Sequence, residues 1–259
     1  MTQTPPEVPA HSLLDDKVVV VTASAGTGIG FATAKRCAEE GATVVLSDHH
    51  ERRLGEAAEK LGELCGTVPL AIQCDVRETE DVERLVKGAV SEHGRIDVMV
   101  NNAGLGGTSD IVDMTEDEWL GVLDVTLNGT FRCTRAAFEH MLPRRAGVVV
   151  NNASVLAWRA QAGQSHYAAA KAGVMALTRC AALEAAPRGV RVNAVAPSLA
   201  MHPFLSKTSS DELIAELTQR EAFGRAAEPW EVANVIVFLA SDYSSYMTGE
   251  VVSVSSQHP

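Results

Sequence analysis

The chain has 259 residues and 46% of them are apolar, so it is long enough to bury the core of one large α/β domain. Its formal net charge of −11 argues against general binding to nucleic acid or to an anionic membrane surface, and no apolar run is long enough to span a membrane. The first twelve residues contain three prolines and no signal-peptide pattern, which predicts a flexible tail over 1–12 and a single domain over 13–259.

Cysteine usage favours a reducing, cytoplasmic compartment. The five cysteines are an odd number, lie far apart and form no C-x-x-C motif. We therefore expect small buried side chains rather than disulfides or metal ligands, and the sequence predicts no metal site. The five are Cys37, Cys65, Cys74, Cys133 and Cys180.

The first predicted elements are a strand, a glycine-rich turn and a helix. A β-branched run over 17–21 predicts a buried parallel strand, and the loop TASAGTGIG over 22–30 leads into a helix over 31–42. Gly26, Gly28 and Gly30 would let backbone N–H groups and the helix N-terminus approach a pyrophosphate. Such a loop alone leaves an ordinary strand-to-helix turn as an alternative.

Acidic residues close the next two predicted strands. Asp48 ends the strand over 42–48, where a carboxylate can accept hydrogen bonds from both ribose hydroxyls of an adenosine. The same carboxylate would repel a 2′-phosphate, which favours NAD over NADP. Arg52 and Arg53 are expected in the following helix, over 50–64. Asp75 ends the strand over 67–75 and could accept a hydrogen bond from an adenine amino group. A turn or helix-capping role is the alternative for both carboxylates, and a helix over 78–94 follows Asp75.

The fourth predicted strand, over 95–104, ends in Asn101, Asn102, Ala103 and Gly104. Two amides and two small residues suit a place where backbone lies close to a flat ligand, although a simple turn is the alternative. A capping box in the sequence TEDE, which begins at Thr115, predicts the start of a long helix over 116–142.

The fifth predicted strand, over 147–154, and its helix carry the chemistry. Ser154 ends the strand, while Tyr167 and Lys171 lie four positions apart on an Ala-rich helix and so project from one face. A free phenol titrates near ~10, and an ammonium one turn away would stabilise the phenolate and make Tyr167 an acid/base group. For the short Y-x-x-x-K pattern alone, a packed tyrosine and a solvated lysine are the alternative.

A sixth strand over 189–198, a helix over 231–241 and a last strand over 249–256 complete a doubly wound, seven-stranded parallel sheet of the Rossmann type. Between them, 198–228 is the expected substrate lid, because it leaves the carboxyl end of a strand. The spacing of Leu213, Ile214 and Leu217 predicts an inward helix face, and a surface helix packed on the core is the alternative. The lid cations Lys207, Arg220 and Arg225 could reach an anion such as a CoA phosphate.

The glycine-rich loop, Asp75, NNAG, Ser154 and Y-x-x-x-K, in this order and spacing, resemble the short-chain dehydrogenase/reductase family over residues 13–256. The resemblance implies that Tyr167 is the general acid/base, that Lys171 binds the nicotinamide ribose and lowers the phenol pKa, and that Ser154 orients the substrate oxygen. It also implies a homodimer or homotetramer. The cofactor contacts it implies are Thr22, Ser24, Gly26, Thr27, Gly28, Ile29, Asp48, Asp75, Val76, Asn102, Ala103, Gly104, Tyr167, Lys171, Pro197, Ser198 and Ala200.

Three departures from the family pattern affect these expectations. The glycine-rich loop is one residue longer between Thr22 and Gly28. Thr126 stands where a catalytic asparagine is common, and only its main-chain carbonyl could support a proton-relay water. After Pro197, Ser198 and His202 replace the usual Gly and Thr; an exposed loop residue is the alternative for His202 to a cofactor or substrate contact.

Within the family, the stretches AGTGIG, SDHHERRLGE and TGEVVSVSSQHP are similar to actinobacterial enzymes of late sterol-ring catabolism. That similarity implies an oxidoreductase acting on a ring hydroxyl or ketone of a bicyclic CoA thioester. A 3-oxoacyl-thioester reductase is an alternative, disfavoured by Asp48 because such reductases generally prefer NADPH. A dinucleotide-binding regulator is disfavoured because Ser154, Tyr167 and Lys171 are all present, and an epimerase or dehydratase of the family's longer branch by the chain length.

Overall fold

The computed structural model describes residues 7–201 and 211–257 and is built on a parallel sheet of seven strands in the order β3-β2-β1-β4-β5-β6-β7. This confirms the predicted doubly wound α/β architecture. The order reverses between β1 and β4, which are direct neighbours, so the crevice expected of such sheets lies beyond their carboxyl ends. The strands are β1 (Val18–Val21), β2 (Thr43–Asp48), β3 (Leu70–Gln73), β4 (Val98–Asn101), β5 (Gly147–Asn152), β6 (Val190–Pro197) and β7 (Val251–Val254).

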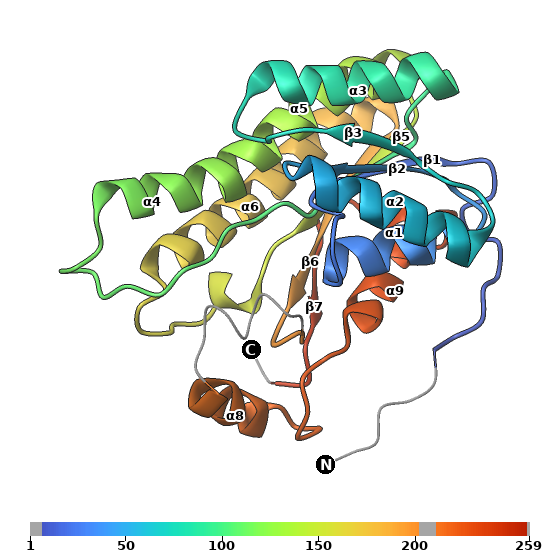
Figure 1. The fold of residues 1–259 in the computed structure, drawn as a ribbon. Helices are drawn as coiled ribbons and strands as arrows, with labels where there is room; N and C mark the ends of the chain where they lie inside the picture. Colours follow the sequence, from blue (N-terminus) through green and yellow to red (C-terminus); the bar gives the residue numbers. More distant parts are fainter. Residues whose placement is uncertain (1–6, 202–210, 258–259) are drawn as a thin grey trace.

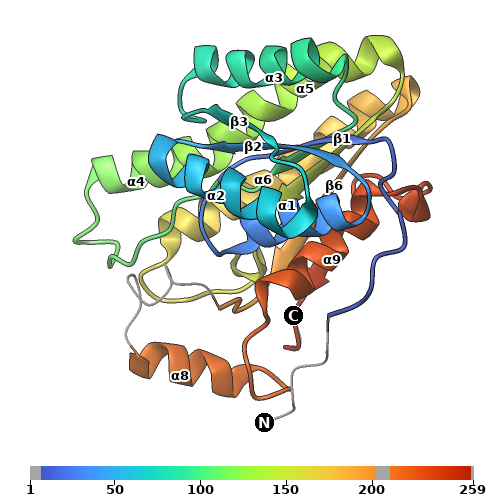
Figure 2. The same ribbon diagram turned by 45° about the vertical axis from the view of Figure 1, so that its right-hand side comes forward.

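Helices cover both faces of this sheet (Figures 1 and 2). One core joins the sheet to α1 (Ile29–Glu39), α2 (Glu51–Cys65) and α9 (Pro229–Ala240). The other joins it to α3 (Thr79–His93), α5 (Gly129–Arg144) and α6 (Ser165–Ala185). Because side chains alternate along a strand, neighbouring valines of β1 enter opposite cores, which explains why this strand is apolar throughout.

The long helix predicted over 116–142 is interrupted. A capping box between Thr115 and Glu118 starts α4 (Glu116–Leu123), as predicted. A π-helical turn, Asp124–Asn128, then separates α4 from α5. Such turns insert one residue into an α-helix and are frequent at functional sites. This one contains Thr126, which is fully buried.

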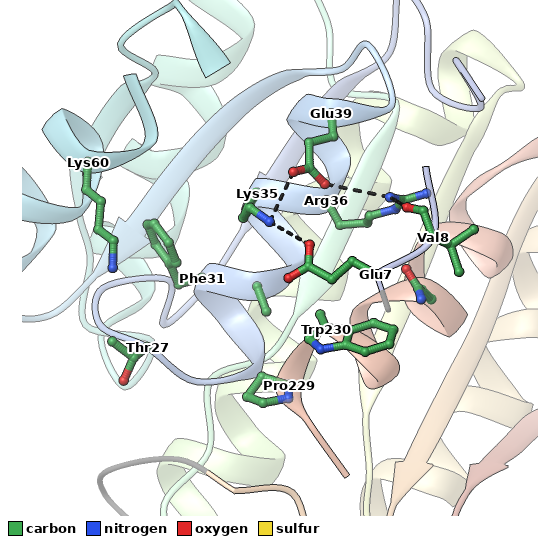
Figure 3. Close-up of a pocket in the computed structure, with 12 residues that line it drawn as sticks. Glu7, Val8, Thr27, Phe31, Lys35, Arg36, Glu39, Lys60, Pro229 and Trp230 are labelled. Carbon is green, nitrogen blue, oxygen red and sulfur yellow. Dashed lines mark hydrogen bonds and ion pairs between the residues drawn. The ribbon is translucent and has the colours of Figure 1, made fainter. Parts of the chain in front are cut away.

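The N-terminal segment from Glu7 onward lies along α1 (Figure 3), and the flexible tail over 1–12 stays a prediction. Arg36 donates to the carbonyls of Val8 and Pro9, and Lys35 pairs with Glu7 at 2.9 Å. The segment forms one side of a pocket of about 220 Å³ whose other walls belong to α1, α2 and α9. Arg36 is buried and also pairs with Glu40 one turn away, whereas its bonds to main-chain carbonyls about 28 positions away could not be predicted from the sequence.

The cysteines are free thiols, and three of the five are buried. Burial raises the pKa of the Cys37 thiol to about 12 and that of Cys74 to about 12, so both stay protonated at neutral pH. Within the ranges 7–201 and 211–257, no helix combines the length and apolar character that a membrane crossing requires.

Candidate active site

Three polar side chains meet where β5 ends and α6 begins. Ser154 follows β5 and is buried, and its hydroxyl accepts from the N–H of Leu156. Tyr167 and Lys171 lie one turn apart on α6, with the ammonium 5.6 Å from the centre of the phenol ring. The structure therefore brings together the three residues that the sequence singles out for catalysis.

Burial governs the ionisation of this group. It raises the pKa of Tyr167, although a hydrogen bond with Ser154 acts in the opposite direction. It also lowers the pKa of Lys171 to about 8. The direction for Tyr167 is opposite to the depression predicted from the sequence, because burial of the phenol outweighs the opposing hydrogen bond with Ser154. The Lys171 ammonium donates to the main-chain carbonyl of Asn152.

Asn152 is a component of this site that sequence reasoning missed. Its carbonyl accepts from Lys171, and its side-chain N–H donates to the side-chain oxygen of Asn102 at 3.0 Å. Asn102 in turn donates to the carbonyls of Thr22 and Ala23, both at 3.1 Å. A continuous chain of hydrogen bonds thus connects Lys171 to the glycine-rich loop. The signal in the sequence is that β4 and β5 both end in an Asn-Asn pair.

Thr22 and the first member of each Asn pair hold the strand ends in register. The Thr22 hydroxyl accepts from the N–H groups of Asn102 and Ala103. Asn101 donates to Asn151 at 2.8 Å and to Thr134, and Asn151 donates to Thr178. These buried bonds fix β4 and β5 against α5 and α6, so the strand ends are rigid.

The glycine-rich loop has the geometry of a phosphate-binding turn. Gly26 has φ +121°, a conformation that favours glycine, and a Cβ on Gly30 would lie 2.2 Å from the carbonyl of Ala23. Gly28 precedes α1 without a side-chain cap, so N–H groups of the first turn remain available to an anion. Thr27 is exposed and lies in the pocket of Figure 3, while Ile29 begins α1. The buried hydroxyl of Ser24 exchanges hydrogen bonds with the main chain of Ser47.

Asp48 lies at the end of β2, as predicted, but is 6% exposed. Its carboxylate accepts from the N–H groups of Ala25 at 3.3 Å and His50 at 3.0 Å, so it also shapes the glycine-rich loop. Burial raises its pKa, and the neighbouring His49 side chain acts against that rise. Arg52 lies on α2 as expected and pairs with Glu56.

Asp75 and Val76 have structural contacts of their own. Arg77 forms a two-pronged hydrogen-bonded ion pair with Asp75, which holds the pKa of that carboxyl below its usual range. The helix-capping alternative for Asp75 is not observed, because Glu78 is the residue that precedes α3. Val76 is buried against Gly129, where a Cβ would come within 2.7 Å of it.

The segment after β4 passes over α6 with little side-chain bulk. A Cβ on Gly104 would lie 3.3 Å from the Lys171 ammonium nitrogen, and one on Gly106 would contact the ring of Tyr167. The Thr126 hydroxyl accepts from the N–H of Leu105 and donates to its carbonyl, and the Thr126 carbonyl accepts from Thr130. Thr126 thus fixes this segment from the π-helical turn.

The expected lid is only partly described. The Ser198 N–H donates to the carbonyl of Val254, and Pro197 is buried. Ala200 forms an isolated β-bridge with Ala227. Helix α8 (Asp211–Arg220) occupies the predicted position. Arg220 pairs with Glu216 at 2.5 Å, and Arg225 forms a two-pronged pair with Glu231. The guanidinium of Arg225 is thus engaged with Glu231, and binding of an anion by the lid cations stays a prediction. His202 and Lys207 lie outside the described residues.

A dinucleotide fits this set of residues, whereas a metal ion has no ligand cluster among the described residues. The open space at Gly26, the uncapped start of α1 and the glycine approach to Lys171 leave room for a phosphate-linked, flat ligand. Hydrogen bonds to Thr22 hold Asn102 and Ala103 beside the glycine-rich loop, and Gly104 lies close to the Lys171 ammonium.

Comparison with known proteins places these features in one family. The family model described as "Enoyl-(Acyl carrier protein) reductase" matches residues 23–256. The chain is 63% identical over 257 residues to the Mycobacterium tuberculosis protein "(5R,7aS)-5-hydroxy-7a-methyl-1-oxo-2,3,5,6,7,7a-hexahydro-1H-indene-carboxyl-CoA reductase", with 98% of each chain covered. It is 39% identical to a Thermotoga maritima 3-oxoacyl-[acyl-carrier-protein] reductase over 93% of this chain and 97% of the relative.

Solved structures agree with the sequence relatives. A short chain dehydrogenase from Mycobacterium smegmatis superposes with a TM-score of 0.88 at 57% identity, covering 99% of both chains. Levodione reductase superposes with a TM-score of 0.89 at 34% identity, covering 94% of this chain and 97% of the other. The chain belongs to the short-chain dehydrogenase/reductase family and is one of its oxidoreductases.

Proposed function

We propose that this protein interconverts a ring ketone and a secondary alcohol on a bicyclic CoA thioester, with a nicotinamide dinucleotide as cofactor. The observation that carries the proposal is the 63% identity, over nearly the whole length, to a relative whose name describes that substrate class. The convergence of Ser154, Tyr167 and Lys171 supports the chemistry, because a ketone oxygen placed there would meet two hydroxyl groups.

The cofactor supplies or accepts the hydride, and the protein manages the proton. The raised pKa of Tyr167 keeps the phenol protonated at neutral pH, so it can donate a proton to the alkoxide oxygen that forms in ketone reduction. Ser154 holds the same oxygen. Lys171 then faces a developing phenolate, and its charge stabilises that anion while Asn152 keeps the ammonium in place.

We propose NAD rather than NADP as the cofactor. Support comes from Asp48, whose buried carboxylate would repel a 2′-phosphate, and from Arg52, which pairs with Glu56 instead of turning toward Asp48. In the variant Asp48→Asn, which keeps a hydrogen-bond acceptor near Ala25, the ratio of kcat/KM for NADH over NADPH should fall by about tenfold. A wild-type preference for NADPH would reject this assignment.

The decisive experiment follows the reaction spectrophotometrically with purified protein and NADH. We expect reduction of an oxo-hexahydroindene carboxyl-CoA thioester with kcat/KM at least about a hundredfold above that for a straight-chain 3-oxoacyl-CoA of equal carbon number. The second candidate function, 3-oxoacyl-thioester reduction, is favoured by the 39% identical Thermotoga maritima relative. It predicts the opposite ranking of the two thioesters.

We also propose a cytoplasmic homo-oligomer, either a dimer or a tetramer. Large apolar side chains are exposed on helices that cover one face of the sheet, including Leu120 on α4, Phe131 on α5 and Leu183 on α6. Contact between copies would remove this surface from water. The free, mostly buried thiols are compatible with a reducing compartment. Light scattering during gel filtration measures the oligomer directly.

A further inference from the structure

The last described residues, Ser255–Gln257, connect the segment that follows Ser154 to the end of α8. The strands β5, β6 and β7 are parallel neighbours, so their carboxyl ends share one edge of the sheet. Ser154 leaves β5 at this edge, and Ser255–Gln257 leave β7 at the same edge. The C-terminal residues therefore come to the catalytic edge by topology, although no motif in the sequence identifies them.

The side-chain amide of Gln257 makes one hydrogen bond through its oxygen and another through its nitrogen. Its side-chain oxygen accepts from the guanidinium of Arg159, which lies on the segment between Ser154 and Tyr167. Its side-chain N–H donates at 2.6 Å to the carboxylate of Glu221, the residue directly after α8. An amide is well suited to this position, because it accepts from a cation with one atom and donates to an anion with the other.

Glu221 depends on these partners. It is 4% exposed, and no cationic side chain in the described part of the chain pairs with it. Ser256 donates to its second oxygen at 2.6 Å, and the Ala222 N–H donates to the Ser256 carbonyl at 3.3 Å. A buried carboxylate is costly without strong donors, so the C-terminal residues stabilise Glu221 where it stands.

The described part of the chain shows few contacts between helix α8 and other helices or strands. In Figures 1 and 2 it lies apart from the helices that cover the sheet. Among the residues described, no other helix or strand shares an extensive contact with it. The bonds of Ser256 and Gln257 to Glu221 and Ala222 consequently fix the end of α8 relative to the segment that contains Arg159.

We propose that Gln257 is a positioning residue of the substrate site, which joins the segment between Ser154 and Tyr167 to the end of α8 through Arg159 and Glu221. This rests on the proposed function, since the two joined segments are taken as opposite walls of the site for a rigid ring substrate. Gln257 contacts neither catalytic hydroxyl. It should therefore set the affinity for the ring substrate and leave proton donation to Tyr167.

The test first removes and then reverses the hydrogen bond between Gln257 and Glu221, with side chains of nearly the same shape. Gln257→Glu places a second carboxylate against Glu221, and we expect KM for the ring ketone to rise about tenfold while kcat and the Kd of NADH stay within about twofold. Adding Glu221→Gln restores a donor and an acceptor at the same atoms, with Arg159 and Ser256 still paired. In this double variant KM should return to within about threefold of wild type. The matched control is Gln219→Glu, the same substitution at an exposed position of α8, which should leave KM unchanged.

Hydrogen–deuterium exchange gives a readout that does not require turnover. Gln257→Glu should speed exchange in α8 by about tenfold, leave α1 unchanged, and be corrected by Glu221→Gln. If wild type reduces no ring thioester, the proposed function fails, but exchange in α8 still decides the role of Gln257. The proposal is overturned if Gln257→Glu matches Gln219→Glu in both measurements, or if the double variant is no better than the single one.

Discussion

The two sides of the catalytic group are held in different ways. On the cofactor side, Thr22, Asn102 and Asn152 lie at the ends of neighbouring strands and form one chain of short hydrogen bonds to Lys171. On the side where we propose that the substrate binds, the end of α8 is joined to the rest of the chain by side chains far apart in the sequence, such as Arg159 and Gln257. If this proposal holds, the ends of the strands fix the Ser154, Tyr167 and Lys171 group, whereas substrate selection depends on a few long-range contacts that can change independently.

The largest effect should come from removing the proton donor on the rigid side. Tyr167→Phe keeps the ring that packs against Gly106 but removes the hydroxyl, so turnover should fall by about 10²–10⁴-fold. The Kd of NADH, measured by fluorescence, should change little. Turnover near that of wild type would exclude Tyr167 from the mechanism.

The next effect tests whether the strand-end chain of hydrogen bonds stabilises the fold. Asn152→Ala leaves the side-chain oxygen of Asn102 without its donor, and the free energy of unfolding should fall by about 1–3 kcal/mol. Denaturant titration measures this. Asn128→Ala is the control, because Asn128 is exposed and its side chain bonds to Asp124 within the same π-helical turn, so the loss there should be under about 0.5 kcal/mol. Equal losses would mean that the chain of bonds adds no stability.

The burial of Lys171 predicts a pH dependence for ketone reduction. The lysine is protonated below its pKa of about 8 and neutral above it, so only below that pH can it stabilise the phenolate left on Tyr167. With kcat/KM measured at saturating NADH, activity should hold below about pH 8 and fall by about tenfold per unit well above it. A profile that stays flat to pH 10 would contradict this role, provided that NADH binding is shown to be constant.

The same contrast explains what could be predicted from the sequence. The site residues that could be predicted lie in or beside the ends of apolar strands, and the order of those strands in the chain sets the order of the motifs. They are Gly26, Asp48, Ser154, Tyr167 and Lys171. The direction of the Tyr167 pKa could not be predicted, because it depends on how completely the folded chain buries the phenol. Pairing of Arg225 with Glu231 and of Gln257 with Glu221 likewise depends on packing, which periodicity does not encode.

The smallest expected effect concerns Arg220, a described cation of the predicted lid. Arg220 lies on the exposed surface of α8 and pairs with Glu216 one turn away, an arrangement that contributes little to stability and partly neutralises the guanidinium. If α8 serves mainly as an apolar wall, Arg220→Gln should change KM for a ring CoA thioester by less than about twofold, even at low salt where long-range attraction is strongest. The control is the neutral ring ketone without CoA, whose KM should respond equally. A rise of tenfold or more for the thioester alone would show that Arg220 leaves Glu216 to bind a CoA phosphate, and the substrate side would then recognise its ligand by charge as well as by shape.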